Sequence, residues 1–170
     1  MDYQGTESQQ AQTGIMPIPM EDYRAYRVSV EVVVDTGEEV LMVSPFGGAF
    51  TANFWSIPSG DVGLDELPDN AALRIAREAT SLMVELTQPA VIGTRVVKTE
   101  QNGKVYRRLV YTYAVGVLRR GNEEMLERFC LSRDYVGHVW LQHGKREIME
   151  RKFDSLDSAV RGMIARYQGA

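Results

Sequence analysis

Several stretches of the chain alternate between apolar and polar positions or are rich in β-branched residues, and these patterns predict strands. The first stretch, Arg27–Val34, is rich in valine, and an apolar run resumes at Glu39–Val43 after the polar residues Asp35–Gly37. A period of two and β-branched side chains are typical of strands, and a short polar turn between two such runs indicates a hairpin. We therefore predict a β-hairpin near the start of the folded part.

The later half of the chain repeats this pattern. Runs at Ala90–Lys98 and Val105–Leu118 flank the turn residues Gln101–Gly103, which predicts a second hairpin. Pro89 is expected to interrupt the chain just before this hairpin, because proline cannot donate a backbone hydrogen bond to a neighbouring strand. A further strand is expected at Tyr135–Leu141.

Between the two hairpins the apolar period changes from two to nearly four. A short strand is expected at Asn53–Ile57, followed by a turn at residues 58–60. Pro68 suits the first turn of a helix, where its missing N–H costs nothing. A helix is then expected over Asp69–Ser81, and a second amphipathic helix over Leu156–Tyr167. The first helix owes its prediction to apolar residues at helical spacing, namely Ala72, Ile75, Ala76, Ala79 and Met83.

The chain of 170 residues is long enough for one domain with a tail. Residues 1–20 are rich in Gln, Gly, Thr and Ser and are expected to form a flexible N-terminal tail, which leaves residues 21–170 as the domain. A hydrophobic fraction of 44% and a charged fraction of 25% are ordinary for a globular protein of this size. Such a domain can bury enough apolar surface to fold without a disulfide or a structural metal.

Charge and cysteine content narrow the classes of partner. A net charge of -4 argues against a broad nucleic-acid-binding surface, although it does not exclude a nucleotide ligand. The single cysteine, Cys130, cannot form an internal disulfide, and a free thiol is typical of a reducing cytoplasm. The sequence contains no apolar run of the length of a membrane span and no signal-peptide pattern. We expect a cytoplasmic protein that binds neither membranes nor nucleic acid.

The candidate chemistry lies between Trp55 and Leu82. Glycine, glutamate, arginine and a second glutamate recur there with gaps of five, seven and three residues, at Gly60, Glu66, Arg74 and Glu78. This spacing resembles the Nudix box, the phosphoanhydride-cleaving motif of the Nudix hydrolases. Three motif positions differ from the family pattern: two glutamates are replaced by Ile75 and Ala79, and a glycine is replaced by Ser81.

The resemblance covers about residues 25–168 and implies a fold. Two further segments support it, the lead-in Trp55–Gly60 and the late segment Asp134–Trp140, which resembles a family strand with an acidic residue before an aromatic end. The family fold is an α/β (α+β) sandwich in which a mixed β-sheet lies between helices. The predicted order of hairpin, short strand, helix, hairpin, strand and terminal helix matches it.

The resemblance also implies a reaction and its residues. Family members cleave a nucleoside diphosphate linked to another group, and they use divalent cations such as Mg²⁺ or Mn²⁺. Carried over position by position, Glu78 is the remaining catalytic carboxylate and metal ligand, and Arg74 and Glu66 hold the acidic cluster. The backbone carbonyl of Ser59 and the carboxylate of Asp134 are the further metal-ligand candidates. Acidic residues of another loop are a rival source of ligands, namely Glu123, Glu124 and Glu127.

Simpler interpretations compete with several of these roles. Ile75, Ala76 and Ala79 are most simply core contacts, and Glu78 could be a solvated partner of Arg74. A register that starts at Gly63 puts Ser81 and Leu82 where the family has its pair of glutamates, so it fits worse. The candidate substrate contacts are Phe46, Phe50 and Gly60, while Tyr113 is better explained as core than as a nucleobase platform.

Three functions therefore remain open from the sequence. The first is a divergent Nudix hydrolase with weak, metal-dependent activity on a nucleoside-diphosphate-linked compound. The second is an inactive Nudix-fold module that binds a nucleotide or a protein. The third is an unrelated fold with coincidental spacing. Nudix domains often dimerise, so a homodimer is one expectation for this chain, whereas the sequence does not identify the substrate.

Overall fold

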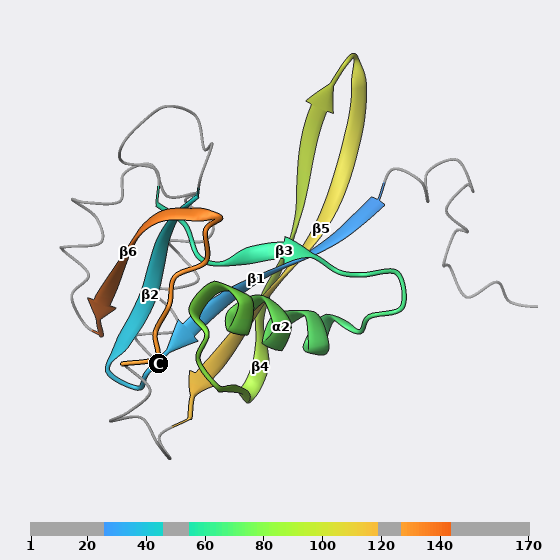
Figure 1. The fold of residues 1–170 in the computed structure, drawn as a ribbon. Coiled ribbons are helices and arrows are strands. Elements are labelled where there is room, and N and C mark those ends of the chain that lie inside the picture. Colours follow the sequence, from blue (N-terminus) through green and yellow to red (C-terminus); the bar gives the residue numbers. More distant parts are fainter. Residues whose placement is uncertain (1–25, 46–54, 119–126, 144–170) are drawn as a thin grey trace, which may run out of the picture.

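A computed structural model describes residues 26–45, 55–118 and 127–143 (Figure 1). The N-terminal tail, Phe46, Phe50, the acidic residues 123 and 124 and the predicted C-terminal helix lie outside these residues. The elements are strands β1 (Tyr26–Asp35), β2 (Glu39–Pro45) and β3 (Ser59–Asp61), helix α2 (Pro68–Thr80), and strands β4 (Val84–Gln101), β5 (Lys104–Val117) and β6 (Tyr135–Gln142).

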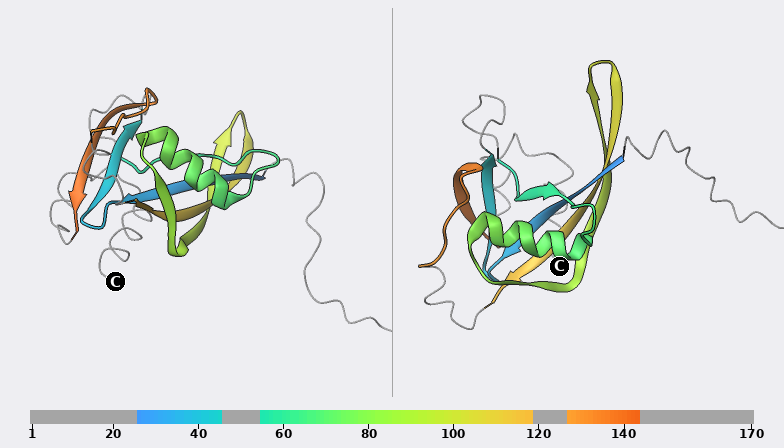
Figure 2. Two further views of the ribbon diagram at one scale, coloured as in Figure 1. Left: turned by 60° about the horizontal axis from the view of Figure 1, so that its bottom comes forward. Right: turned by 45° about the vertical axis from the view of Figure 1, so that its right-hand side comes forward.

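The six strands form one mixed sheet, as the sequence predicts. The strand order is β4-β5-β1-β2-β6, and β3 pairs with β1 outside this path. The β1–β5 pair is parallel, whereas β4–β5, β2–β6 and β1–β3 are antiparallel. Helix α2 lies across one face of the sheet over β1 and β5 (Figure 2). Within the described ranges, no helix is long and apolar enough to cross a membrane.

The first predicted hairpin is confirmed, but its strands separate. Asp35 turns the chain by accepting a hydrogen bond from the N–H of Gly37 at 2.7 Å. Strands β1 and β2 are paired only at Asp35 and Val40, and β1 then runs between β3 and β5 instead. Both faces of β1 are buried there. Val30 and Val32 lie on the face towards α2, whereas Ser29 and Glu31 lie on the other face and form hydrogen bonds with Asp61 and Thr112.

Two apolar clusters flank the sheet. The first lies between β1, β5 and α2 and includes Val30, Val32 and Val34 together with the alanines of the helix. The second lies on the opposite face of the sheet and consists of Val33, Val40, Met42, Ile57 and Leu141. The alternation of Val33 with its neighbours follows from the period of two in a strand.

Helix α2 confirms the predicted helix and begins one residue earlier, at Pro68. The N–H of Ser81, which adopts a left-handed conformation with φ 60°, donates a hydrogen bond to the Arg77 carbonyl and ends the helix. The buried face contains Ile75 and the alanines 71, 72, 76 and 79. Met83, in contrast, lies beyond the helix and is 60% exposed, because the chain leaves the helix axis at Ser81.

Two predictions around the prolines are wrong in detail. The predicted strand Asn53–Ile57 is reduced, in its described part, to one bridge between Ser56 and Val43, and the strand lies instead at Ser59–Asp61, where a turn is expected. Pairing with Ser29–Glu31 of β1 overrides the local turn preference of Ser-Gly-Asp. Pro89 does not end the strand, since β4 runs through it with register shifts between Leu86 and Gly93 that spare it a ladder hydrogen bond.

The second hairpin is confirmed and is longer than the rest of the sheet. Its turn residues Asn102 and Gly103 both have positive φ, 53° and 72°, which is typical of a tight hairpin turn. Strands β4 and β5 remain paired out to Gln101 and Lys104, whereas β1 reaches β5 only as far as Arg107. The end of the hairpin therefore projects from the sheet as a two-stranded ribbon (Figure 1).

Candidate functional site

Arg74 is the centre of the polar network on helix α2. Its Nε donates a hydrogen bond to Glu66 Oε1 at 2.7 Å, and its Nη2 donates to Glu66 Oε2 at 2.8 Å. The same Nη2 also donates to the Asp61 carbonyl at 3.0 Å. The N–H of Gly63 donates to Glu66 Oε2 at 2.9 Å, which closes the network from the loop side. The loop between β3 and α2 is thus held to the helix by one paired arginine and glutamate.

This network shifts the pKa values of both partners. The hydrogen bond from Arg74, followed by that from the Gly63 N–H, lowers the pKa of Glu66 from 4.5 to about 2. The hydrogen bond to Glu66 raises the pKa of Arg74 above its usual range. Both side chains therefore remain charged at neutral pH, and the bidentate geometry gives the pair a fixed orientation.

The lowered pKa of Glu66 predicts a loss of stability in acid. A carboxylate with a lowered pKa stabilises the folded state fully above its unfolded pKa, near 4.5, and this contribution disappears as the pH falls towards 2. The free energy of unfolding should therefore exceed that of Glu66→Gln at about pH 7, and the difference should shrink below about pH 4.5. Urea unfolding of the wild type and of Glu66→Gln across this pH range measures the difference in free energy, with Asp65→Asn as the control. A difference that does not change with pH would contradict this assignment.

Glu78 lies one helical turn beyond Arg74 and is exposed. Arg74 Nη1 donates a hydrogen bond to Glu78 Oε2 at 3.2 Å, and the Glu78 side chain is 64% exposed. One carboxylate oxygen is therefore oriented by the arginine while the other has no described partner. The structure thus brings together Glu66, Arg74 and Glu78, the three residues that the motif names as catalytic.

The pKa of Tyr135 is affected by all three predicted metal-ligand residues, namely Ser59, Glu78 and Asp134. Burial is the main cause of the raised pKa of Tyr135, and the negative charges of Asp134 and Glu78 raise it further. A hydrogen bond with the backbone of Ser59 acts in the opposite direction. The phenol therefore lies near the backbone of Ser59 in β3. Sequence reasoning did not single out Tyr135, although its position directly after Asp134 was the available signal.

The predicted metal-ligand residues offer only a few oxygen atoms to a metal ion. Asp134 is exposed and accepts a hydrogen bond from Ser132 Oγ at 3.2 Å. Within the described residues, no group of three or more His, Cys, Asp or Glu side chains is arranged to hold a metal ion. The Glu78 and Asp134 carboxylates and the Ser59 carbonyl suit a hard cation that keeps most of its waters or arrives with phosphate oxygens. They do not form a cage for a resident metal.

Ile75 fills the space in which a further metal-binding carboxylate would have to lie. Its side chain is 4% exposed, and a Cβ added at Gly60 would lie 3.2 Å from both Ile75 Cδ1 and Ile75 Cγ1. Ala79, at the other altered motif position, is 2% exposed. Close packing between the helix and β3 therefore explains Gly60 without a substrate contact. Both altered positions face the core, as their apolar character predicts.

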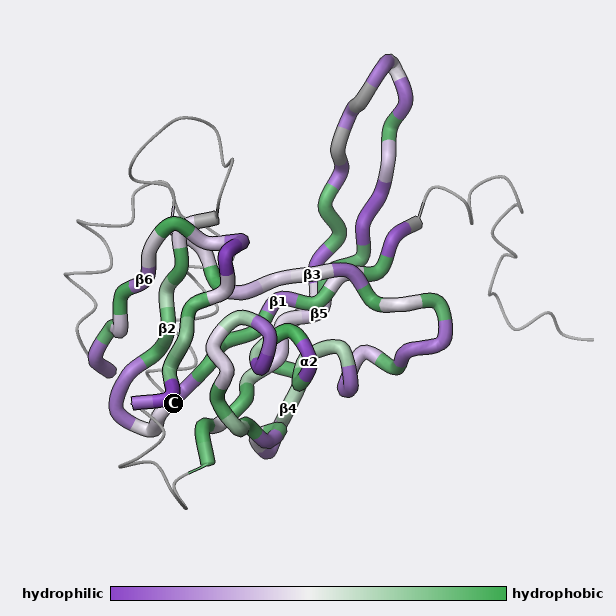
Figure 3. The backbone as a smooth tube through the Cα atoms, in the orientation of Figure 1, coloured by the Kyte–Doolittle hydropathy of each residue, from purple (hydrophilic) through white to green (hydrophobic). Residues whose placement is uncertain are grey.

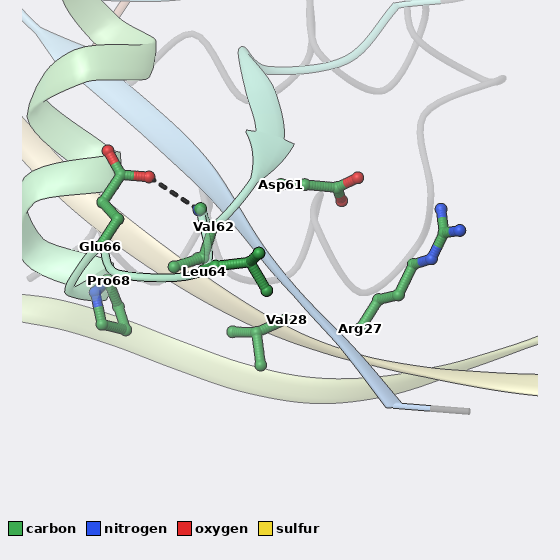
Figure 4. Close-up of a pocket in the computed structure, with 8 residues that line it drawn as sticks. Arg27, Val28, Asp61, Val62, Leu64, Glu66 and Pro68 are labelled. Carbon is green, nitrogen blue, oxygen red and sulfur yellow. Dashed lines mark hydrogen bonds between the residues drawn. The ribbon is translucent and has the colours of Figure 1, made fainter. Parts of the chain in front are cut away.

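A cavity of about 520 Å³ opens at the other end of the helix (Figure 4). Pro68 and Glu78 are ten residues apart, so the cavity lies about 15 Å along the helix axis from the Glu78 end. Ser29 Oγ donates a hydrogen bond to Asp61 Oδ1 at 2.7 Å on its wall. The loop held by Glu66 and Arg74 forms part of the lining, which comprises Arg27, Val28, Asp61, Val62, Gly63, Leu64, Glu66 and Pro68.

Tyr113 and the two histidines, His138 and His143, have structural contacts in the described part of the chain. Tyr113 is buried and its hydroxyl donates to Asp69 Oδ1 at 2.5 Å, so it holds the start of α2 rather than presenting a platform for a base. His138 packs against the ring of Phe129, with centroids 4.7 Å apart. His143 Nε2 lies 2.9 Å from Asp35 Oδ1.

A buried ion pair on the sheet face opposite α2 is a further polar feature. Arg95 Nη2 lies 2.7 Å from Glu31 Oε2, and the Thr112 hydroxyl donates to Glu31 Oε1 at 2.7 Å. Glu31 is 4% exposed. The three residues come from β1, β4 and β5, so they join three strands. The only sequence signal was an acidic residue inside the apolar run of β1.

Comparison with known proteins identifies the fold. No family model matches the chain, and no curated protein matches it in sequence. Among solved structures, a NUDIX hydrolase from Nitrosomonas europaea is 18% identical with a TM-score of 0.61, over 84% of this chain and 88% of that one. An Ap4A hydrolase from C. elegans is 15% identical with a TM-score of 0.58, over 84% and 96% of the two chains.

A third similar structure contains a nucleotide and a metal ion. It is a bifunctional NMN adenylyltransferase/ADP ribose pyrophosphatase from Francisella tularensis in complex with AMP and a Mn ion. It is 16% identical with a TM-score of 0.57, over 85% of this chain and 41% of that one. These likenesses concern the arrangement of the sheet and helix.

Proposed function

Because the chain has the Nudix fold, we propose that it acts on a nucleoside diphosphate linked to another group and hydrolyses the phosphoanhydride bond slowly. In this proposal a water adds to one phosphorus, the bridging P–O bond breaks, and Glu78 accepts the proton from the water. Mg²⁺ or Mn²⁺, if bound together with the substrate phosphates, would neutralise part of their charge. Glu78, the Ser59 carbonyl and Asp134 are the groups that would hold it.

One observation carries the proposal. Arg74 donates hydrogen bonds to Glu66 and Glu78 at the same time, and this leaves the Glu78 side chain oriented but exposed. The guanidinium is itself fixed by Glu66 and by the Asp61 carbonyl, so it holds the Glu78 carboxylate in one direction. The network therefore supports a positioned acid–base group at this end of α2.

The proposed rate is low because the carboxylate cluster is incomplete. Ile75 and Ala79 cannot bind a cation or activate water, and both are buried. A positioned general base commonly contributes about 10²–10⁴-fold to a rate, and a complete metal site contributes further. We expect turnover lower by at least this order of magnitude than in a hydrolase with all three carboxylates.

A second candidate is binding without turnover. The observation that favours it is Ile75, whose side chain packs against Gly60 in the space beside Ser59. In that case the nucleotide-like ligand stabilises the fold, by about 2.7 kcal/mol at a concentration 100 times its Kd. A protein ligand at the same site is the other form of this candidate.

The test is phosphate release from a panel of ADP-ribose, dinucleoside polyphosphates, NADH, nucleotide sugars and nucleoside triphosphates, with Mg²⁺ and with Mn²⁺. We expect slow metal-dependent release that Glu78→Gln lowers by about 10²–10⁴-fold or to background. Asp65→Asn removes an exposed carboxylate from the neighbouring loop and should change the rate little. Equal rates for the wild type and Glu78→Gln would overturn the hydrolase, and ligand-dependent thermal stabilisation without release would select the binding candidate.

We also propose a domain organisation, a location and an oligomeric state for the protein. A single domain over residues 21–170 with a tail at residues 1–20 follows from composition, and a cytoplasmic location is consistent with the exposed free thiol of Cys130. We propose a homodimer because Nudix domains often dimerise. Light scattering of the full chain measures this directly.

A further inference from the structure

The cavity at the start of α2 has no role in the proposed hydrolysis. Its volume of about 520 Å³ lies in the range of pockets that hold small molecules, about 300–1,000 Å³. Ser59, Glu78 and Asp134, which are all described, do not line it. The Glu78 end of the helix is about 15 Å away along the helix axis. A ligand in this cavity would therefore occupy a site separate from the proposed hydrolase site.

The middle of the cavity wall is apolar. Val28, Val62 and Leu64 line it, and Figure 4 shows them between Glu66 on one side and Asp61 on the other. Leu64 is fully exposed in the loop between β3 and α2. Figure 3 shows hydrophobic positions between hydrophilic ones along this loop. An apolar surface that lines a hollow favours a ligand with an apolar body, because binding would remove both surfaces from water.

Arg27 brings an unpaired positive charge to the wall. Within the described part of the chain, its guanidinium forms no salt bridge and no hydrogen bond. Arg108 of β5 shares a register position with Arg27 of β1 and likewise has no partner among the described residues. Both side chains leave the same face of the sheet from strands about 4.8 Å apart. Like charges at neighbouring positions repel each other, and an anion bound to both would remove this repulsion.

The two carboxylates that line the cavity do not neutralise these arginines. Glu66 is already bound by Arg74 and by the Gly63 N–H. Asp61 accepts a hydrogen bond from Ser29 Oγ at 2.7 Å and forms no salt bridge with Arg27, although both residues line the cavity. Two guanidiniums thus face one unpaired carboxylate at this end of the cavity, so an anionic group is favoured there.

We infer that the cavity binds a small organic anion. Its head group, a phosphate or a carboxylate, lies against Arg27 and Arg108, and its apolar body lies against Val28, Val62 and Leu64. Guanidinium groups bind both kinds of head group through paired N–H donors. A bare ion would leave the apolar wall in water, so the body of the ligand should add to its affinity. The inference does not rest on the proposed hydrolase function.

The experiment is an NMR titration of the full chain with phenyl phosphate and with benzoate, in EDTA and without divalent cations. Inorganic phosphate and acetate are the matching ions without a ring. We expect at least one aromatic anion to bind about tenfold or more tightly than its bare ion, and the tighter of the two identifies the head group. The amide shifts should change most at residues 27–28 and 61–68.

Variants of the wall test each part of the site. Arg27→Gln and Arg108→Gln should each weaken binding of the aromatic anion about 10- to 100-fold, because each removes charge-assisted hydrogen bonds. Leu64→Ser should weaken it about three- to tenfold and should change binding of the bare ion little. Leu64 is fully exposed, so this variant should fold like the wild type.

The matched control is Arg77→Gln, which removes an arginine from an exposed position of α2 and should leave binding unchanged. Thermal unfolding of all variants checks that they fold. Equal loss of binding in Arg77→Gln and Arg27→Gln would overturn the inference, as would aromatic anions that bind no more tightly than the bare ions. Shifts centred on Ser59 and Glu78 would also overturn it, because the anion would then bind at the proposed hydrolase site.

Discussion

The Arg95→Met variant is expected to lose about 3–5 kcal/mol of folding free energy, because it leaves the carboxylate of Glu31 buried without a counter-charge. Glu31 is 4% exposed, so water cannot replace the guanidinium. The Thr112 hydroxyl, which donates to Glu31 Oε1, neutralises no charge. The cost is therefore that of an unpaired buried ion, not that of one hydrogen bond.

Thermal and urea unfolding measure this effect. For a chain of this size the expected loss corresponds to a fall of roughly 10 °C in Tm. The control is the double variant Glu31→Gln/Arg95→Met, which removes both charges and should recover much of the loss, since replacing a buried pair by neutral groups is far less costly than breaking it. A double variant that is less stable than Arg95→Met would show that Arg95 acts through its other contacts.

Restoring the motif glutamate at position 75 is expected to destabilise the protein instead of activating it. Ile75 is 4% exposed and fills the gap to Gly60, so Ile75→Glu replaces buried apolar contacts by a carboxyl group without a partner. The combined loss of packing and of solvation should cost about 2–4 kcal/mol. Phosphate release should not rise above that of the wild type.

Two matched variants separate packing from charge. Ile75→Val shortens the same side chain and should cost about 0.5–1.5 kcal/mol. Asn70→Glu places a carboxylate at an exposed position of the same helix and should change stability by less than about 0.5 kcal/mol. Urea unfolding gives the free energies. A stable Ile75→Glu variant with increased metal-dependent turnover would show that the site accommodates a second carboxylate and would strengthen the hydrolase proposal.

Local patterns are sufficient for much of the fold. The apolar spacing from Ala72 to Ala79 predicts α2 to within one residue of its start, and the Asn102–Gly103 turn predicts the second hairpin. These signals depend on neighbours in the chain, since helical period and positive φ are properties of short segments. The motif spacing likewise predicts that Glu66, Arg74 and Glu78 meet, because seven residues of helix and loop bring them to one face.

Contacts between segments that are far apart in the sequence are known only from the tertiary structure. Ser59–Asp61 becomes a strand because β1 pairs with β2 only at Asp35, so that its residues Ser29–Glu31 pair with Ser59–Asp61 instead. Local propensity does not predict this pairing. Tyr135, at the start of β6, forms a hydrogen bond with the backbone of Ser59 although the two residues are far apart in the sequence. The Glu31–Arg95 pair bridges strands that are 64 residues apart in the sequence. Contacts of this kind arise from packing and burial of the whole sheet, so a pattern read along the chain does not predict the pair.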